Sequence, residues 1–188
     1  MGLIGAGRTG LSLLACLIVL VFIACHNKKT HLPEDRTDSA SQEVLDAWVW
    51  RSENGKLQLD LDAPVIRKYT RPRAKTVYLG NAERRVKMRF FNEQREVRSS
   101  IEADSAFSLD ESNIMEAHGD VVVIDYSKND TIYLEDLIWN SAEDRIYSEH
   151  RVVARNGNRI TEGDGFESDQ RMENMRVVRQ RGTIEIED

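Results

Sequence analysis

The chain has 188 residues, 31% of them charged, and a formal net charge of −6 at pH 7. This length suits one domain of moderate size, and the acidic balance, without a basic face rich in aromatic residues, argues against nucleic acid as a partner. Both cysteines, Cys16 and Cys25, lie near the N-terminus. The rest of the chain therefore holds neither a disulfide nor a cysteine metal site.

The N-terminal segment is typical of an exported protein. Its apolar stretch, Leu11 to Ala24, has the length of the hydrophobic region of a secretory signal and is short for a membrane span. The stretch ends in Phe-Ile-Ala-Cys25, which resembles the lipobox of bacterial lipoproteins. We predict a signal or anchor segment over residues 1–25, and we favour a lipid anchor on Cys25 over a single uncleaved helix. A polar tether is predicted over residues 26–45.

Residues 46–188 are predicted to form one β-domain. Trp48 and Trp50 lie two residues apart in the first expected strand, so they should point to the same side, as core or as the wall of a groove. Asn54-Gly55 predicts a tight hairpin turn, because these residues tolerate positive φ angles. Residues 57–62 then alternate leucine with polar residues, which is typical of a strand with one apolar face.

Two segments that echo each other dominate the second half of this domain. Ile114–Val122 carries His118, and Ile146–Val153 carries His150 at the corresponding place. A strand-like run precedes each segment, and such regular spacing favours stacked β-hairpins. Turn residues divide the region at Gly119-Asp120, Lys128–Asp130, Glu143-Asp144 and Asn156–Asn158. The whole domain is predicted to be all-β, with about fifteen short strands and no helix.

No catalytic constellation is evident in the sequence. The two histidines lack a third ligand at metal spacing, and Glu162-Gly-Asp-Gly165 lacks the run of oxygen ligands that a calcium loop needs. We expect surface or structural histidines, a tight turn at Glu162–Gly165, and no catalytic residue, metal or cofactor. Strands with one apolar face allow three interpretations. Their apolar faces could form a trough for an acyl chain, their free edges could add a partner's strand, or the faces could simply pack together into a hydrophobic core.

The order of four segments resembles the LptC family, the periplasmic component of lipopolysaccharide export. The segments are Gly119-Asp-Val-Val122, Thr131–Trp139, Arg145-Ile-Tyr-Ser148 and Ile160–Phe166, the last with a Gly-x-Gly-Phe turn. Each segment is unspecific alone, but the four occur in order and at fitting separations. The resemblance covers most of the domain, from about Trp48 to Val178.

The resemblance implies a twisted β-jellyroll that is open along one side, at the periplasmic face of the inner membrane. It implies a carrier without enzymatic activity, which accepts lipopolysaccharide acyl chains from an inner-membrane ABC transporter and passes them to a periplasmic bridge protein of related fold. Gly163 and Gly165 match the family's turn. The candidate residues of the lipid trough, chosen by strand parity, are Ile101, Ala103, Phe107, Ile132, Leu134 and Phe166.

Two other functions are weighed against this one. An exported β-sandwich lipoprotein that binds carbohydrate or another envelope protein would show aromatic residues in a shallow surface patch and a sealed core. An envelope hydrolase would show an acid–base pair that converges in a cleft.

Overall fold

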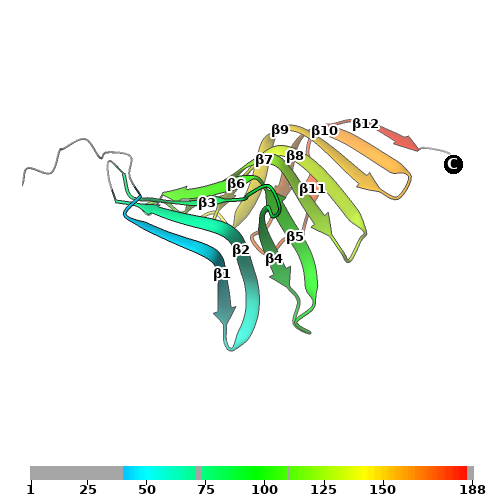
Figure 1. Cartoon of the computed structure of the whole chain (residues 1–188). Helices are drawn as coiled ribbons and strands as arrows, with labels where there is room; N and C mark the ends of the chain where they lie inside the picture. Colours follow the sequence, from blue (N-terminus) through cyan, green and yellow to red (C-terminus); the bar gives the residue numbers. More distant parts are fainter. Residues whose placement is uncertain (1–39, 71–72, 110, 186–188) are drawn as a thin grey trace, which may run out of the picture. The chain divides into compact units, whose positions relative to one another are not determined.

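The computed structural model describes residues 40–70, 73–109 and 111–185, which form one antiparallel sheet system with twelve strands and no helix among them (Figure 1). The strands are β1 (Gln42–Glu53), β2 (Lys56–Tyr69), β3 (Lys75–Leu79), β4 (Val86–Phe91), β5 (Val97–Ala103), β6 (Ser105–Leu109), β7 (Ile114–Asp125), β8 (Asp130–Asn140), β9 (Arg145–Asn156), β10 (Arg159–Ser168), β11 (Arg176–Val177) and β12 (Gln180–Glu185). The prediction of an all-β jellyroll is confirmed. The predicted anchor and most of the predicted tether lie outside the described residues, and β1 begins before the boundary predicted at residue 45.

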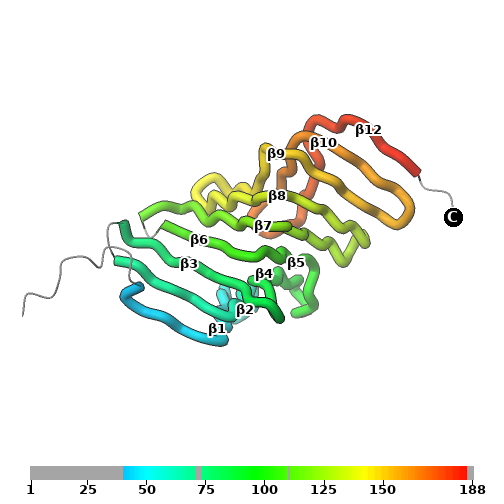
Figure 2. The backbone as a smooth tube through the Cα atoms, turned by 45° about the horizontal axis from the view of Figure 1, so that its top comes forward, coloured from blue at the N-terminus to red at the C-terminus, as the bar shows by residue number. Residues whose placement is uncertain are grey.

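The strands pair in the order β11-β10-β9-β8-β7-β5-β4-β2-β3-β6. In addition, β6 pairs with β7, β1 pairs with β2, and β12 pairs with β10. Figure 2 shows β7, β8, β9 and β10 side by side in chain order. These four strands are joined by short turns at Lys128–Asn129, Glu143-Asp144 and Gly157-Asn158, which agrees with the predicted turns.

The long strands change partners midway, and this divides the sheet into two layers. The first part of β2 pairs with β4 and its second part with β3, while β7 pairs first with β6 and then with β5. Figure 1 shows β1 and β2 bending together where this change occurs. The first layer contains 42–45, 65–69, β3, β6, 114–118, 136–140, 145–148, 166–168 and β11. The second layer contains 47–53, 56–63, β4, β5, 121–125, 130–134, 152–156, 159–163 and β12.

The bends lie at residues with unusual backbone angles. Gly119 and Asp120 have φ values of +82° and +43°, and the register between β7 and β8 shifts there. Gly165 has a φ of +136° where the register between β9 and β10 shifts. The turns predicted at Gly119-Asp120 and at Glu162–Gly165 are therefore wrong: both are β-bulges inside one strand, which bend it without ending it. A bent strand such as β2, β7 or β10 looks like two shorter strands in the sequence. About fifteen strands were therefore predicted, whereas the described residues form twelve.

The hydrophobic core lies between the inner faces of the two layers. Alternation along each strand turns one side chain in two towards it, so Leu61 and Ile101 enter from the second layer and Leu137 and Ile146 from the first. All four are under a tenth exposed. This arrangement matches the one-sided alternation of the sequence.

The line of bends carries polar side chains that hold neighbouring strands together. Arg85 binds the Asp104 carboxylate at 3.0 Å and donates to the carbonyl oxygens of Gly119 and Asp120, each at 2.7 Å. Further along, Arg181 binds Asp164 at 2.6 Å. Because the bulges leave ladder groups unpaired, such side chains supply partners for the backbone and fix the angle of the bend.

Candidate functional site

A small apolar cavity lies between the layers. Its volume is about 40 Å³, far below the roughly 300–1,000 Å³ of typical ligand pockets. In the state described here the inner faces therefore pack together, and an acyl chain would need the layers or their loops to move apart. The lining residues are Leu61, Val86, Met88, Ile101, Ala103, Ala106, Met115, Ala117, Leu137 and Trp139.

Five of the six residues predicted for the trough lie in the core between the layers. Ile101 and Ala103 line the cavity itself. Ile132, Leu134 and Phe166 are buried in the same apolar cluster, away from the cavity wall. Their binding of lipid stays a prediction, but their place in the interior is a fact of the fold.

Phe107 lies apart from this group. Ala106 points inwards and is 3% exposed, so Phe107 next to it points to the opposite face, where its ring stacks on His118 with 5.5 Å between ring centroids. The shared parity expected for Ile101, Ala103 and Phe107 fails because Asp104 interrupts the strand between β5 and β6.

Sequence reasoning missed much of the cavity wall. Met115 and Ala117 alternate inside the echoed segment, and Trp139 closes the leucine-and-tryptophan run, so periodicity could have found them. It could not have shown which apolar positions of the two layers meet, because that depends on the bends. Trp139 also contacts Phe90 across the layers, edge to face, at 6.5 Å between centroids.

Gly163 and Gly165 allow a close approach to the segment that follows β11. A side chain at Gly163 would meet Val177, and its Cβ would lie 2.7 Å from the carbonyl oxygen of Val178. At Gly165 a Cβ would lie 3.1 Å from the carbonyl oxygen of Ser148, and the backbone also has positive φ. The two glycines thus bring β10 close to its neighbours at the bulge.

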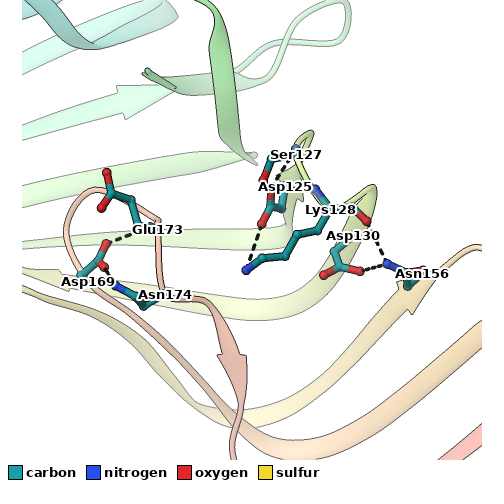
Figure 3. Close-up of polar contacts among 8 residues, drawn as sticks. All are labelled: Asp125, Ser127, Lys128, Asp130, Asn156, Asp169, Glu173 and Asn174. Atoms are coloured by element: carbon teal, nitrogen blue, oxygen red, sulfur yellow. Dashed lines mark hydrogen bonds and ion pairs between the residues drawn. The ribbon is translucent and has the colours of Figure 1, made fainter. Parts of the chain in front are cut away.

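The loop of residues 169–175, between β10 and β11, inserts into the interior. Its Met172 is 1% exposed and belongs to the core cluster. The Asp169 side chain fixes the loop by accepting from the backbone N–H of Glu173 at 2.9 Å and from the Asn174 amide at 2.5 Å (Figure 3). Arg98 of β5 binds Glu173 at 2.5 Å. We call this segment the plug loop.

A second, larger cavity lies where the plug loop meets the ends of two hairpins. Its volume is about 550 Å³, and its wall is mostly polar with some apolar side chains. We call it the mouth. Trp139 lines both the mouth and the interior cavity. The residues of the mouth are Arg51, Glu53, Asn54, Lys56, Gln58, Leu59, Phe90, Phe91, Asn92, Glu93, Gln94, Arg98, Trp139, Gln170, Arg171 and Glu173.

Strand β1 is an edge with exposed apolar side chains. Among the described residues it pairs with β2 alone, which leaves its other side free. Trp48 and Trp50 are 54% and 57% exposed, and their rings lie 4.9 Å apart. A core position is wrong for both, because their side of β1 turns away from the interior, and a place in a groove wall stays a prediction. Leu45 and Val49 are exposed as well.

Behind the tryptophans lies a buried charge. Asp60 is 2% exposed and accepts two hydrogen bonds from Arg89, each at 2.8 Å, and one from Trp48 Nε1 at 3.0 Å. The hydrogen bonds that Arg89 donates to the Asp60 carboxylate raise the pKa of Arg89 above its ordinary value. The pair fastens β1, β2 and β4 to one another on the outer face of the second layer.

The two echoed histidines lie on β7 and β9, the strands on either side of Asp136 in β8. His118 lies across from Asp136 in the β7–β8 register, and His150 Nδ1 lies 2.8 Å from Asp136 Oδ1. This hydrogen bond raises the pKa of His150. Burial raises the pKa of Asp136, but the hydrogen bonds from His150 and Ser148 outweigh it, and the net shift is downward. Within residues 40–185, leaving out 71–72 and 110, no three His, Cys, Asp or Glu side chains are grouped as metal ligands would be.

Fold and site together define a class: an antiparallel jellyroll with an apolar interior between two layers and with free edges. The family model of LptC, described as "Lipopolysaccharide-assembly, LptC-related", matches residues 11–185. The chain therefore belongs to the LptC family, whose members are components of lipopolysaccharide transport associated with the periplasmic side of the inner membrane, and bind and transport rather than catalyse. No curated protein matches the chain. Among the described residues no helix is long and apolar enough to cross a membrane.

Proposed function

We propose that this chain carries the acyl chains of lipopolysaccharide between its two layers, from an inner-membrane ABC transporter to a periplasmic bridge protein. The observation that carries the proposal is the interior cavity, because residues of both layers line it and all of them are apolar. Such a wall offers a polar ligand little beyond the buried, unpaired indole N–H of Trp139, whereas each methylene that it takes from water is worth about 0.8 kcal/mol.

Transfer of this kind needs no bond chemistry in the chain itself. The inner faces, now packed on each other, exchange their mutual contacts for contacts with an acyl chain of similar polarity, so the net change in free energy is small. A small net change suits a carrier, which must release what it binds. The energy for directed movement comes from nucleotide hydrolysis in the transporter.

The free edges offer places for the two partners. On β1 the unpaired backbone groups and the exposed Leu45 and Val49 favour the addition of a strand from the transporter. At the other end, β12 pairs with β10 alone among the described residues and exposes Ile184. A bridge protein of related fold would continue the sheet there, and the layers of both proteins would then line up.

A second candidate function has an observation in its favour. Trp48 and Trp50 form an exposed pair, in which Trp48 shares the Asp60 carboxylate with Arg89, and aromatic pairs of this kind serve as platforms for sugar rings or for a partner protein. A surface site there would leave the interior unused. Exchange of both tryptophans for alanine would abolish binding in that case, and would leave acyl-chain binding intact if our proposal holds.

Photo-crosslinking tests the proposal directly with purified protein and lipopolysaccharide. A crosslinking amino acid in place of Ile101 faces the interior cavity, and one in place of Phe107 on β6, the next strand along the chain, faces away from the interior. We expect adducts with lipopolysaccharide from position 101 and none from position 107. Equal adducts from both positions, or none from position 101 in a folded protein, would contradict an acyl-chain site between the layers.

A further inference from the structure

The mouth combines features that an amphiphile's headgroup requires. Its lining combines apolar side chains, among them the buried Phe90 and the partly buried Trp139, with four cationic, three anionic and five amide side chains. Amides donate to and accept from sugar hydroxyls, and guanidinium groups bind phosphate in bidentate geometry. Because Trp139 also borders the interior cavity, a lipid whose chains enter between the layers places its headgroup here.

The cations of the mouth are not all neutralised by the protein. Arg51 and Arg171 are exposed, and neither forms an ion pair or a side-chain hydrogen bond with any other described residue. Lys56 lies 3.8 Å from Glu93 with both side chains more than half exposed, and an ion pair of that kind is weak. The mouth also contains Glu53, so its balance is one positive charge, on a chain whose net charge is −6.

Arg98 is the most buried cation of the mouth, and one of its donors lacks a partner. Its side chain is 17% exposed, it binds Glu173 through one Nη, and its Nε is buried without a hydrogen-bond partner. A buried donor without an acceptor costs about 1–3 kcal/mol. An oxyanion with several oxygens can satisfy Nε and Nη together, which the single contact with Glu173 does not do.

We infer that the mouth is a binding site for a phosphorylated sugar headgroup, with Arg51, Arg98 and Arg171 as the groups that hold the phosphate. This inference rests on the proposed function and adds the orientation of the lipid to it. Arg98 exchanges Glu173 for phosphate on binding. Because Glu173 belongs to the plug loop, whose Met172 fills the interior, recognition of the headgroup loosens the segment that the acyl chains must displace.

The test compares lipopolysaccharide with the same lipid after removal of its phosphates. Equilibrium binding is measured for the wild type, for the double variant Arg51→Gln/Arg171→Gln, and for Arg159→Gln as a control. Arg159 is exposed, lies outside the mouth and forms no ion pair with another residue that the structure describes. We expect the wild type to prefer the phosphorylated lipid at least about tenfold, in line with the loss of a charge-assisted hydrogen bond. The double variant should lose this preference and keep its affinity for the dephosphorylated lipid, and Arg159→Gln should match the wild type.

The other outcomes contradict either the headgroup site or the proposed function. If the wild type binds both lipids equally, the headgroup site is wrong while the acyl-chain site stands. If neither lipid binds and position 101 gives no adduct, the proposed function itself fails. If inorganic phosphate at the same concentration displaces the phosphorylated lipid completely, the mouth is a site for free phosphate, and the assignment to a lipid headgroup is overturned.

Discussion

Three hydrogen-bond donors surround the buried Asp60 carboxylate. The two bonds from Arg89 and the one from Trp48 use both carboxylate oxygens, so the cost of removing this charge from water is offset by directed hydrogen bonds. From the sequence, Asp60 looks like any other polar residue on the solvated face of an alternating strand. Its burial arises from β1, β4 and their side chains, which fold over it from elsewhere in the chain.

Replacing this carboxylate should weaken the fold measurably. We expect Asp60→Asn to lower the free energy of unfolding by about 1–3 kcal/mol, since the amide cannot accept from all three donors and leaves Arg89 without its counter-charge. Urea unfolding measures the effect. Asp62→Asn is the matched control two residues along the same strand, where the side chain is 39% exposed, and it should change stability by less than about 0.5 kcal/mol. Similar losses from both variants would show that Asp60 is no anchor.

The contact between Asp136 and His150 should make stability depend on pH. His150 has a raised pKa because of its hydrogen bond to Asp136, so the stabilisation is fully present below the unfolded pKa of about 6.5 and disappears as the pH rises through the folded pKa. Asp136 has a lowered pKa, so its share is present above about 3.8 and is lost as the pH falls further. The pair therefore contributes most between these two values.

We expect His150→Gln to destabilise the protein more at about pH 5.5 than at about pH 8.5, as measured by chemical unfolding at both values. In a background with Asp136→Asn, the same exchange should have nearly the same effect at both pH values. An effect of His150→Gln that does not vary with pH in the native background would contradict a charged contact.

At the scale of elements, the bulge in β10 positions the segments around it. A tight turn and a β-bulge both need a residue without a side chain, so the same glycines suit either. Only the pairing of β10 with β9 and β12 shows that the strand continues through them. The same holds for Gly119 in β7. Sequence identifies where the backbone must bend, while the partners across the sheet decide whether the bend ends the strand.

Alanine variants of three glycines separate the two reasons why a position needs glycine, namely a positive φ and a lack of space for a Cβ atom. Gly165→Ala should cost about 1–3 kcal/mol because its φ of +136° strains any other residue. Gly163→Ala should also destabilise the fold, since the new methyl group would press on Val177 and Val178. Gly182→Ala in β12 meets nothing within 4 Å and should have little effect. Thermal unfolding of the three variants measures the order, and a loss at Gly182 as large as at Gly165 would contradict it.

The plug loop is the element that was hardest to predict from the sequence. Residues 169–175 are polar apart from two methionines, and nothing in their pattern indicates that Met172 is buried. We expect Met172→Ala to lower the free energy of unfolding by about 2–5 kcal/mol, because it leaves space in the core, and to speed the uptake of lipid. Met175→Ala, at a position that is only partly buried, should cost less. Equal effects on stability would show that Met172 does not fill the interior.

At the scale of the whole molecule, much of the architecture was predictable. Alternation gave the all-β domain and the inward faces of Ile101, Ala103, Ile132, Leu134 and Phe166. The count of strands and the side of Phe107 were not predictable, because both depend on bends that shift parity within a run. The mouth brings together hairpin ends and a loop that are far apart in the chain, so no local pattern could have indicated it.

The two layers, the plug loop and the free edges each have a part in the proposed function. The layers supply an apolar interior and the plug loop fills it in the structure, and we propose that the edges β1 and β12 line this interior up with those of the partners. The proposed function requires that acyl chains reach the interior in response to work done by the transporter.

The measurement that tests this requirement most directly is crosslinking in cells. A photo-crosslinking residue replaces Ile101, and the nucleotide hydrolysis of the transporter is either intact or blocked by an active-site substitution in its ATPase. The proposed function predicts lipopolysaccharide adducts at position 101 when hydrolysis is intact and a clear loss of them when it is blocked, with the protein folded in both. Adducts of equal yield in both conditions, or none in either, would contradict the role of the interior as a path for acyl chains.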